Sequence, residues 1–128
     1  MALRIPSRFS RTNGQITHES LIGQWIYLLS QLDEVTQIVE IGAWRGGGST
    51  KLIAQGMSRR STPNQALCLE ADSKMFEEAQ MRHRGSKGVK LLWGSLVPAT
   101  DLDSTDLSPE EKNGYRKILR CSINAPLC

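Results

Sequence analysis

The chain has 128 residues, a length that fits one domain with a modest hydrophobic core. Its 16 basic residues against 13 acidic ones leave a net charge of +3, and the basic cluster at 82–90 has no interleaved aromatic residues, which argues against nucleic-acid binding. Three cysteines fit neither a disulfide framework nor a zinc site, and no apolar run approaches the ~18 residues of a membrane span. We therefore expect reduced thiols, a cytoplasmic location, and no binding to nucleic acid or membrane.

Residues 1–16 are expected to form a flexible N-terminal arm. This segment has three arginines and no acidic residue, a composition also found in organellar transit peptides. Pro6 and Gly14 argue against a stable amphipathic helix there, so we favour the arm. The folded domain is expected to span residues 17–128.

A helical apolar pattern begins near Thr17, a possible helix cap. Apolar residues then recur at steps of three and four, which predicts a helix whose apolar face packs on a sheet. These residues are Leu21, Ile22, Trp25, Ile26, Leu28, Leu29 and Leu32.

Residues 38–54, with the sequence IVEIGAWRGGGSTKLIA, carry the strongest functional signal. A short apolar strand, a glycine-bearing loop and the start of a helical pattern are typical of a cradle for a phosphate or a nucleotide. Gly42 lets the chain turn off the strand. The three glycines at 46–48 allow close backbone approach to a ligand and supply N–H donors.

Two common nucleotide-binding patterns fail in this loop. A Walker A loop requires lysine where this chain has Gly48, and Lys51 comes three residues too late. A dinucleotide fingerprint requires a third glycine, and Lys51 stands in its place.

Two further strand–helix units are expected after the loop. A helix at 49–57 precedes a buried strand at 66–69, and a helix at 73–83 precedes a strand at 89–93. Consecutive crossovers imply a parallel sheet whose ligand lies at the carboxyl ends of the strands. Of the acids after the second strand, Glu70 is preferred as a ligand for ribose hydroxyls, and Asp72 as a helix cap.

The segment Glu40-Ile41-Gly42-Ala43-Trp44-Arg45-Gly46, followed by Ser49-Thr50, resembles the E-x-G-x-x-x-G loop of class I S-adenosylmethionine-dependent methyltransferases. The ends of the second and third strands, at 68–72 and 91–95, resemble that family as well, so the resemblance covers roughly residues 38–96. It implies an α/β fold: a partial Rossmann-like three-layer sandwich with parallel strands in the order 3-2-1. The cofactor-binding residues that it implies are Glu40, Gly42, Ala43, Gly46, Ser49, Glu70, Ala71, Gly94, Ser95 and Leu96.

The resemblance also assigns roles within the site. Glu70 would orient the ribose, residues 42–48 would approach the methionine part, and residues 94–96 would lie beside the adenine. Glu40 would fix the loop or the amino-acid end of the cofactor, while Ser49 would accept the cofactor's carboxylate or cap the helix. In the family, the helix before the first strand sometimes lines the site, so substrate contact is the alternative to core packing for Trp25 and Tyr27.

The C-terminal third offers no catalytic group. Asp101, Asp103 and Asp106 lack the glycine and glutamate that a calcium loop requires. The sequence at 108–111 is a capping box with proline at the first helical position, and it predicts a helix over 107–121. The expected buried face of that helix consists of Tyr115, Ile118 and Leu119.

The family's domain has about seven strands, with the substrate site built from the fourth onward, and we expect the C-terminal strands to be absent from residues 17–128. The chain is therefore expected to be the cofactor-binding half of a small-molecule methyltransferase with unknown acceptor and catalytic base, and with no metal site. The strand at 38–41 would be an open edge, which predicts a homo-oligomer or pairing with a complementary C-terminal half. A non-catalytic fragment and, less favoured, an NAD-binding oxidoreductase are the alternatives.

Overall fold

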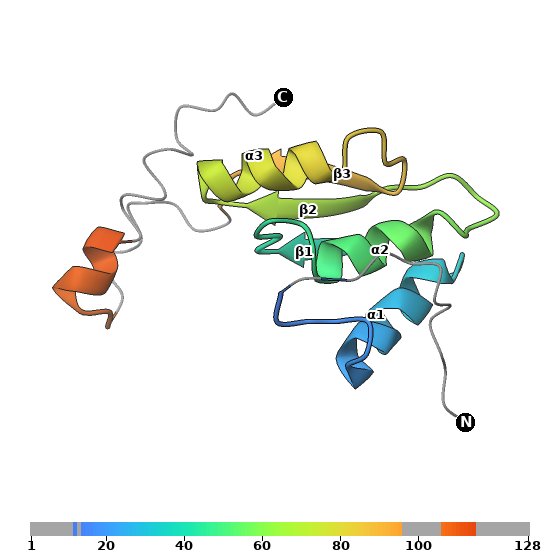
Figure 1. Cartoon of the computed structure of the whole chain (residues 1–128), viewed down its shortest axis with the longest axis horizontal. Helices are drawn as coiled ribbons and strands as arrows, with labels where there is room; N and C mark the ends of the chain where they lie inside the picture. The colour runs from blue at the N-terminus through green and yellow to red at the C-terminus, as the bar shows by residue number, and fades with distance from the viewer. Residues whose placement is uncertain (1–11, 13, 96–105, 115–128) are drawn as a thin grey trace.

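The computed structural model describes residues 12, 14–95 and 106–114. Helices and parallel strands alternate along the chain, which confirms the α/β class (Figure 1). The elements are α1 (Leu21–Gln31), β1 (Val39–Ile41), α2 (Ser49–Met57), β2 (Ala66–Glu70), α3 (Ser73–Arg82) and β3 (Val89–Trp93). The expected site residue Leu96 lies outside the described residues.

The sheet has the order β1-β2-β3, with β2 in the centre. The strand order is thus 1-2-3 rather than the expected 3-2-1. Both orders pair the same neighbouring strands, because one is the other counted from the opposite edge of the sheet. Both pairings are parallel: Glu40 is opposite Cys68, which is opposite Leu91. Side chains alternate between the two faces of a sheet along each strand. The side chains of Glu40, Cys68 and Leu91 therefore lie on one face, and those of the residues just before and after them on each strand lie on the other.

Both crossover helices cover the same face of the sheet, so the described residues form two layers and the expected three-layer sandwich is wrong for them. Met57 of α2 packs in one core cluster with Val89 of β3, while Phe76 of α3 stacks on Trp93 of the same strand. Val89 and Trp93 point to the same face because they are separated by an even number of residues. Right-handed connections that step in one direction across a sheet place their helices on one side.

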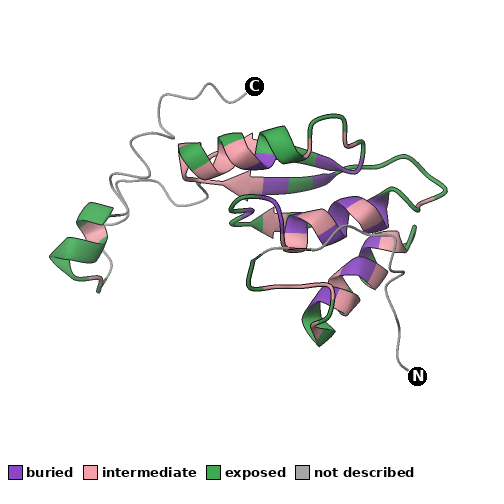
Figure 2. Ribbon diagram, in the orientation of Figure 1, coloured by how far each residue is buried: buried purple, intermediate pink, exposed green. Residues whose placement is uncertain are grey.

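The helix α1 packs chiefly on α2 and lies beyond the β1 side of the sheet, so the prediction that its apolar face packs on the sheet is wrong (Figures 1 and 2). Tyr27 is buried as expected, with 5% of its surface exposed, but Trp25 is 54% exposed. Ile26 alone among the predicted apolar face packs against the core cluster. Periodicity identified the helix but not the neighbour that it would meet.

Small residues bring α1 and α2 together. A Cβ atom added at Gly56 of α2 would stand 2.5 Å from the Cβ of Ser30 and 2.7 Å from the carbonyl oxygen of Tyr27. Beyond the helices, the Nε atom of Arg60 donates to the Ser30 carbonyl at 2.8 Å and Nη1 donates to the Val35 carbonyl at 2.7 Å. Close backbone packing and this guanidinium therefore fix α1 on α2.

The predicted side-chain caps are present at α3 and at the helical segment that begins at residue 109, whereas the predicted cap of α1 is wrong. The cap of α1 is Ser20, which accepts from the Gly23 amide, and not Thr17. Asp72 caps α3 through the Met75 amide as predicted. The predicted capping box is confirmed, since the Glu111 amide donates to the Ser108 hydroxyl at 3.3 Å and the Ser108 amide donates to the Glu111 carboxylate at 2.9 Å.

That box opens a helical segment over the described residues 109–114. The rest of the helix predicted over 107–121, with Tyr115, Ile118 and Leu119, lies outside the described residues.

Replacing Gly56 with alanine should separate α1 from α2. Overpacking typically costs ~1–3 kcal/mol and the better helix propensity of alanine returns up to ~1 kcal/mol, so we expect a net loss of about 1–2 kcal/mol in the free energy of unfolding. Urea unfolding followed by circular dichroism measures it. Gly114→Ala is the control, because a Cβ there meets nothing within 4 Å. Equal stability of the two variants would contradict the packing argument.

Candidate functional site

The carboxyl ends of the three strands come together at one edge of the sheet. The amides of Gly42 and Ala43 both donate to the Leu69 carbonyl at 2.9 Å, which carries the loop after β1 across the end of β2. The amide of Gly94 donates to the Glu70 carbonyl at 3.0 Å and extends the pairing of β2 with β3. The predicted contact segments at 40–49, 70–71 and 94–95 therefore follow neighbouring strand ends.

A cavity of about 580 Å³ lies against the loop that follows β1. This volume is in the range of small-molecule sites. Its lining combines the loop with the segment that precedes α1, namely Gly14, Gln15, Ile16, Gly42, Ala43, Trp44, Gly48 and Ser49. The sequence did not predict a part in the site for residues 14–16.

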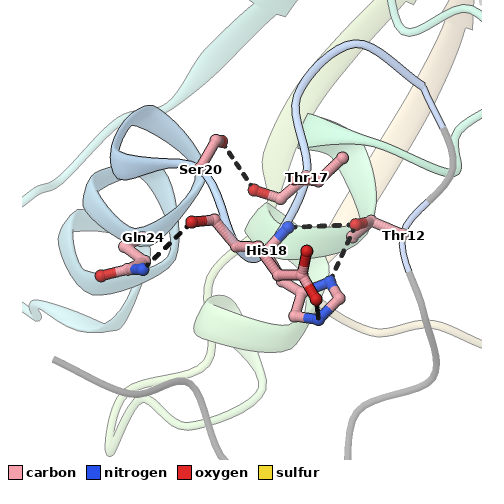
Figure 3. Close-up of polar contacts among 6 residues, drawn as sticks. Thr12, Thr17, His18, Ser20 and Gln24 are labelled. Atoms are coloured by element: carbon pink, nitrogen blue, oxygen red, sulfur yellow. Dashed lines mark hydrogen bonds and ion pairs between the residues drawn. The ribbon is translucent and has the colours of Figure 1, made fainter.

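Local hydrogen bonds hold the segment before α1 in place (Figure 3). The amide of His18 donates to the Thr12 hydroxyl at 3.0 Å, and the Ser20 hydroxyl donates to the Thr17 carbonyl at 2.7 Å. A Cβ added at Gly14 would stand 3.7 Å from the Trp44 ring, so this turn packs against the loop. The hydrogen bond between Thr12 and His18 spans residues 14–16, and Gly14 lies close to the Trp44 ring, so neighbouring residues position this wall of the cavity.

Glu70 ends β2 with its carboxylate turned toward the loop after β1. One carboxylate oxygen accepts from the Trp44 amide at 2.6 Å and the other from the Asp72 amide at 2.9 Å. Trp44 has a φ of +50°, a left-handed conformation that is uncommon for a bulky residue. A charged acceptor therefore holds this residue of the loop, and each of its oxygens keeps further acceptor capacity.

Glu40 points to the helix-covered face, below the loop. Its carboxylate accepts from the Ser49 hydroxyl and, at 2.6 Å, from the buried Thr50 hydroxyl. The helix cap of α2 is Gly48, and no side chain caps that end, so the predicted capping role of Ser49 is wrong. Burial, with the neighbouring Glu40 as a smaller cause, raises the pKa of the Cys68 thiol and keeps it protonated.

His83, which the sequence analysis did not select, fixes the middle of the loop. Its Nε2 atom lies 2.6 Å from the Gly46 carbonyl oxygen, which can only accept, so Nε2 carries the proton. Gly46 has a φ of +70°, and an added Cβ would stand 2.9 Å from the imidazole ring. No spacing in the sequence indicates this contact, since the two residues lie on different elements.

Trp44 and Arg45 are tied to α3 as well. The Arg45 guanidinium lies over the Trp44 ring, 5.1 Å from its centroid, and its Nε atom pairs with Glu78 at 3.3 Å. The Nε atom of Arg82 donates to the Arg45 carbonyl at 3.1 Å. This part of the loop is therefore anchored to α3 by backbone and side chain.

Gly94 and Ser95, the described residues expected beside an adenine, are not among the residues that line the cavity. The Ala71 carbonyl accepts from the Trp93 indole at 3.1 Å, and the Trp93 ring stacks on Phe76 with centroids 6.4 Å apart. Gly94 is half-buried and Ser95 is exposed. The structure thus assembles every described candidate residue at one edge, in two adjoining groups that meet at the hydrogen bond between Trp44 and Glu70.

Within the described residues, no group of His, Cys, Asp and Glu side chains is arranged to hold a metal ion. The helices of this part of the chain are too short or too polar to cross a membrane. A scan against models of known protein families found no matching family, and a search of curated protein sequences found no relative.

The burial of the His83 side chain predicts a pH dependence of stability. Burial is the main cause that lowers the pKa of His83, with the Arg82 and Lys51 charges in the same direction and the hydrogen bond to Gly46 and the Glu40 charge opposing. The unfolded chain, with a histidine pKa of about 6.5, then binds more protons than the folded chain at lower pH. This contribution to stability is present above pH ~6.5 and is lost as the pH falls from there through the folded pKa.

Urea unfolding at a series of pH values between 5 and 7.5 measures this loss. His83→Gln supplies an amide donor that does not titrate, and we expect it to show a smaller loss of stability toward low pH than the natural chain. Matching pH profiles for the two proteins would rule out His83 as the responsible group.

Proposed function

We propose that this chain binds S-adenosylmethionine as the cofactor-binding part of a small-molecule methyltransferase. The observation that carries the proposal is the meeting of the glycine loop after β1 with the carboxylate that ends β2, through the hydrogen bond from the Trp44 amide to Glu70. In a parallel sheet this edge is where ligands bind.

The residues present fit the chemistry of that cofactor. A ribose offers hydroxyl donors, and Glu70 is a half-buried carboxylate at the end of the central strand. The cavity beside Gly42 and Gly48 has the volume for the methionine part, and glycines there let a ligand approach the backbone. Glu40 is engaged with Ser49 and Thr50, so we assign it to positioning the start of α2 rather than to the cofactor's amino group.

The reaction we propose is methyl transfer to an acceptor that the sequence does not identify. The cofactor supplies an activated methyl group when bound, and the chain's own contribution is to hold and orient it. Glu70 would hold the ribose, and the loop at 42–48, anchored by His83 and Glu70, would keep the methyl-bearing end in one position. No described residue is assigned the role of a catalytic base.

A non-catalytic fragment that associates with another chain is the second candidate function. It is favoured by the apolar side chains of β1, since Val39 is 56% and Ile41 69% exposed. In the described residues β1 pairs with β2 alone, so its other edge presents backbone groups to a partner strand. An NAD-binding oxidoreductase is supported less, because Lys51 replaces the third glycine of the fingerprint. The cytoplasmic location stays a prediction.

Calorimetric titration with S-adenosylmethionine and S-adenosylhomocysteine, with NAD and ATP as comparison ligands, tests the proposal. We expect only the first two to bind. Glu70→Gln keeps an oxygen for the Trp44 amide but removes the charge. Because hydrogen bonds to a charged group contribute ~1.5–3 kcal/mol, binding should weaken roughly 10- to 100-fold.

Glu77→Gln is the matched control, since it removes an exposed carboxylate of α3 and should leave affinity unchanged. Binding of NAD in preference to the methionine-derived pair would support the oxidoreductase. A folded chain that binds none of the four ligands would overturn the proposal and favour the fragment that associates with another chain.

A further inference from the structure

A second cavity, of about 400 Å³, is lined by α2 and by the end of α3 with the turn that follows it. We call it the basic cavity, because two of its lining residues are cations and none of them is acidic. One wall is a single side of α2, and the other is formed by residues 82–86. The lining residues are Lys51, Ala54, Gln55 and Ser58 on the first wall, and Arg82, His83 and Ser86 on the second.

The surroundings of Lys51 disfavour its positive charge. Lys51 stands in the first turn of α2, where the positive end of the helix dipole repels a cation. Burial lowers the pKa of Lys51, and the charge of Arg82 acts in the same direction. An anion between the two cations would offset this cost, because it would attract both of the charges that now repel each other.

Arg82 by itself would not indicate a ligand. A cation near the carboxyl end of a helix interacts favourably with the helix dipole, and the Nε atom of Arg82 donates to the Arg45 carbonyl at 3.1 Å. Neither contact accounts for Lys51, which belongs to the other wall. The presence of two cations on opposite walls of one cavity is therefore the observation that indicates an anionic ligand.

The hydrogen-bond donors of the basic cavity fit a phosphate group. A guanidinium has five N–H donors, of which Arg82 uses one at the Arg45 carbonyl, and an ammonium has three. The Ser86 amide donates to the His83 carbonyl at 2.9 Å, which holds the Ser86 hydroxyl in this wall. Donors on two walls suit the three oxygens of a phosphate better than the two of a carboxylate. We propose that the basic cavity binds the phosphate group of a small molecule through Lys51, Arg82 and Ser86.

The cavity also has room and a hydrogen-bond acceptor for an organic part of the ligand. Its volume lies in the range of small-molecule sites. The Oε1 atom of Gln55 is buried and has no hydrogen-bond partner within the described residues. A hydroxyl group of the ligand would satisfy this acceptor. The ligand class that fits is a phosphorylated hydroxy compound such as a sugar phosphate.

This inference goes beyond the proposed function and does not rest on it. The basic cavity shares no lining residue with the cavity beside Gly48. The two are connected through the loop, because Arg82 and His83 line the basic cavity and also contact the carbonyls of Arg45 and Gly46. A phosphate in the basic cavity would therefore contact residues that support the loop.

Calorimetric titration of the full chain with ribose 5-phosphate tests the proposal, with inorganic phosphate, ribose and acetate as comparison ligands. We expect ribose 5-phosphate to bind most tightly, inorganic phosphate to bind more weakly, and ribose and acetate not to bind. Equal affinity for the two phosphates would support the phosphate contacts and assign the site to the free ion. Binding of acetate as tightly as phosphate, or no binding of either phosphate to a chain that circular dichroism shows to be folded, would overturn the proposal.

Matched variants test which residues bind the phosphate. Lys51→Gln should weaken the binding of ribose 5-phosphate roughly 10- to 100-fold, because one hydrogen bond to a charged group loses its charge. Ser86→Ala keeps every charge and should weaken binding roughly 2- to 10-fold. Lys74→Gln is the control, since it removes an exposed lysine of α3 that does not line the cavity. Equal weakening by Lys51→Gln and Lys74→Gln would show a general attraction to surface charge and overturn the proposal.

Nuclear magnetic resonance locates the bound phosphate. Ribose 5-phosphate should shift the amide peaks of Gln55 and Ser86. It should also raise the pKa of His83, because a nearby anion favours the charged imidazole. Peak shifts confined to residues 42–49, with no change in the pKa of His83, would place the ligand in the candidate functional site and overturn the assignment to the basic cavity.

Discussion

The loop between β1 and α2 is the element on which the candidate site depends, and polar side chains of neighbouring elements hold it. Glu70 accepts the Trp44 amide, and His83 donates to the Gly46 carbonyl. Glu40, below the loop, accepts the hydroxyls of the residues that begin α2. These anchors come from β2, the end of α3 and β1, so the shape of the loop is determined by the packing of the whole unit and not by its glycines alone.

The two faces of the sheet differ because of one geometric rule. Two right-handed crossovers that step in one direction concentrate both helices, and the core with Cys68 and Val89, on a single side. The opposite rows, with Val39 and Ile41, keep apolar side chains that a fully covered sheet would bury. The exposed apolar side chains of Val39 and Ile41, which favour the fragment alternative, originate in this asymmetry.

The sequence predicted the elements and the neighbouring strands well, but it predicted the packing of α1 and the contacts between distant elements poorly. The bounds of α2 and β3 match because a glycine loop and two glycines separate clear patterns, and the Asp72 cap follows a local rule. The exposed Trp25 was missed because periodicity gives the apolar side of a helix but not the surface that it meets. His83 was missed because a contact between distant elements leaves no spacing to recognise.

The contact between Glu70 and the loop bears directly on ligand binding. A carboxylate has about four acceptor positions, and the amides of Trp44 and Asp72 occupy two of them. Ribose hydroxyls can therefore bind Glu70 without displacing either amide, and the left-handed conformation of Trp44 need not change. A site already held in this form loses less conformational entropy when the ligand binds. The carboxylate that supports the loop is thus also the group that we propose to hold the ribose, so a substitution that removes its charge and keeps its shape is the informative one.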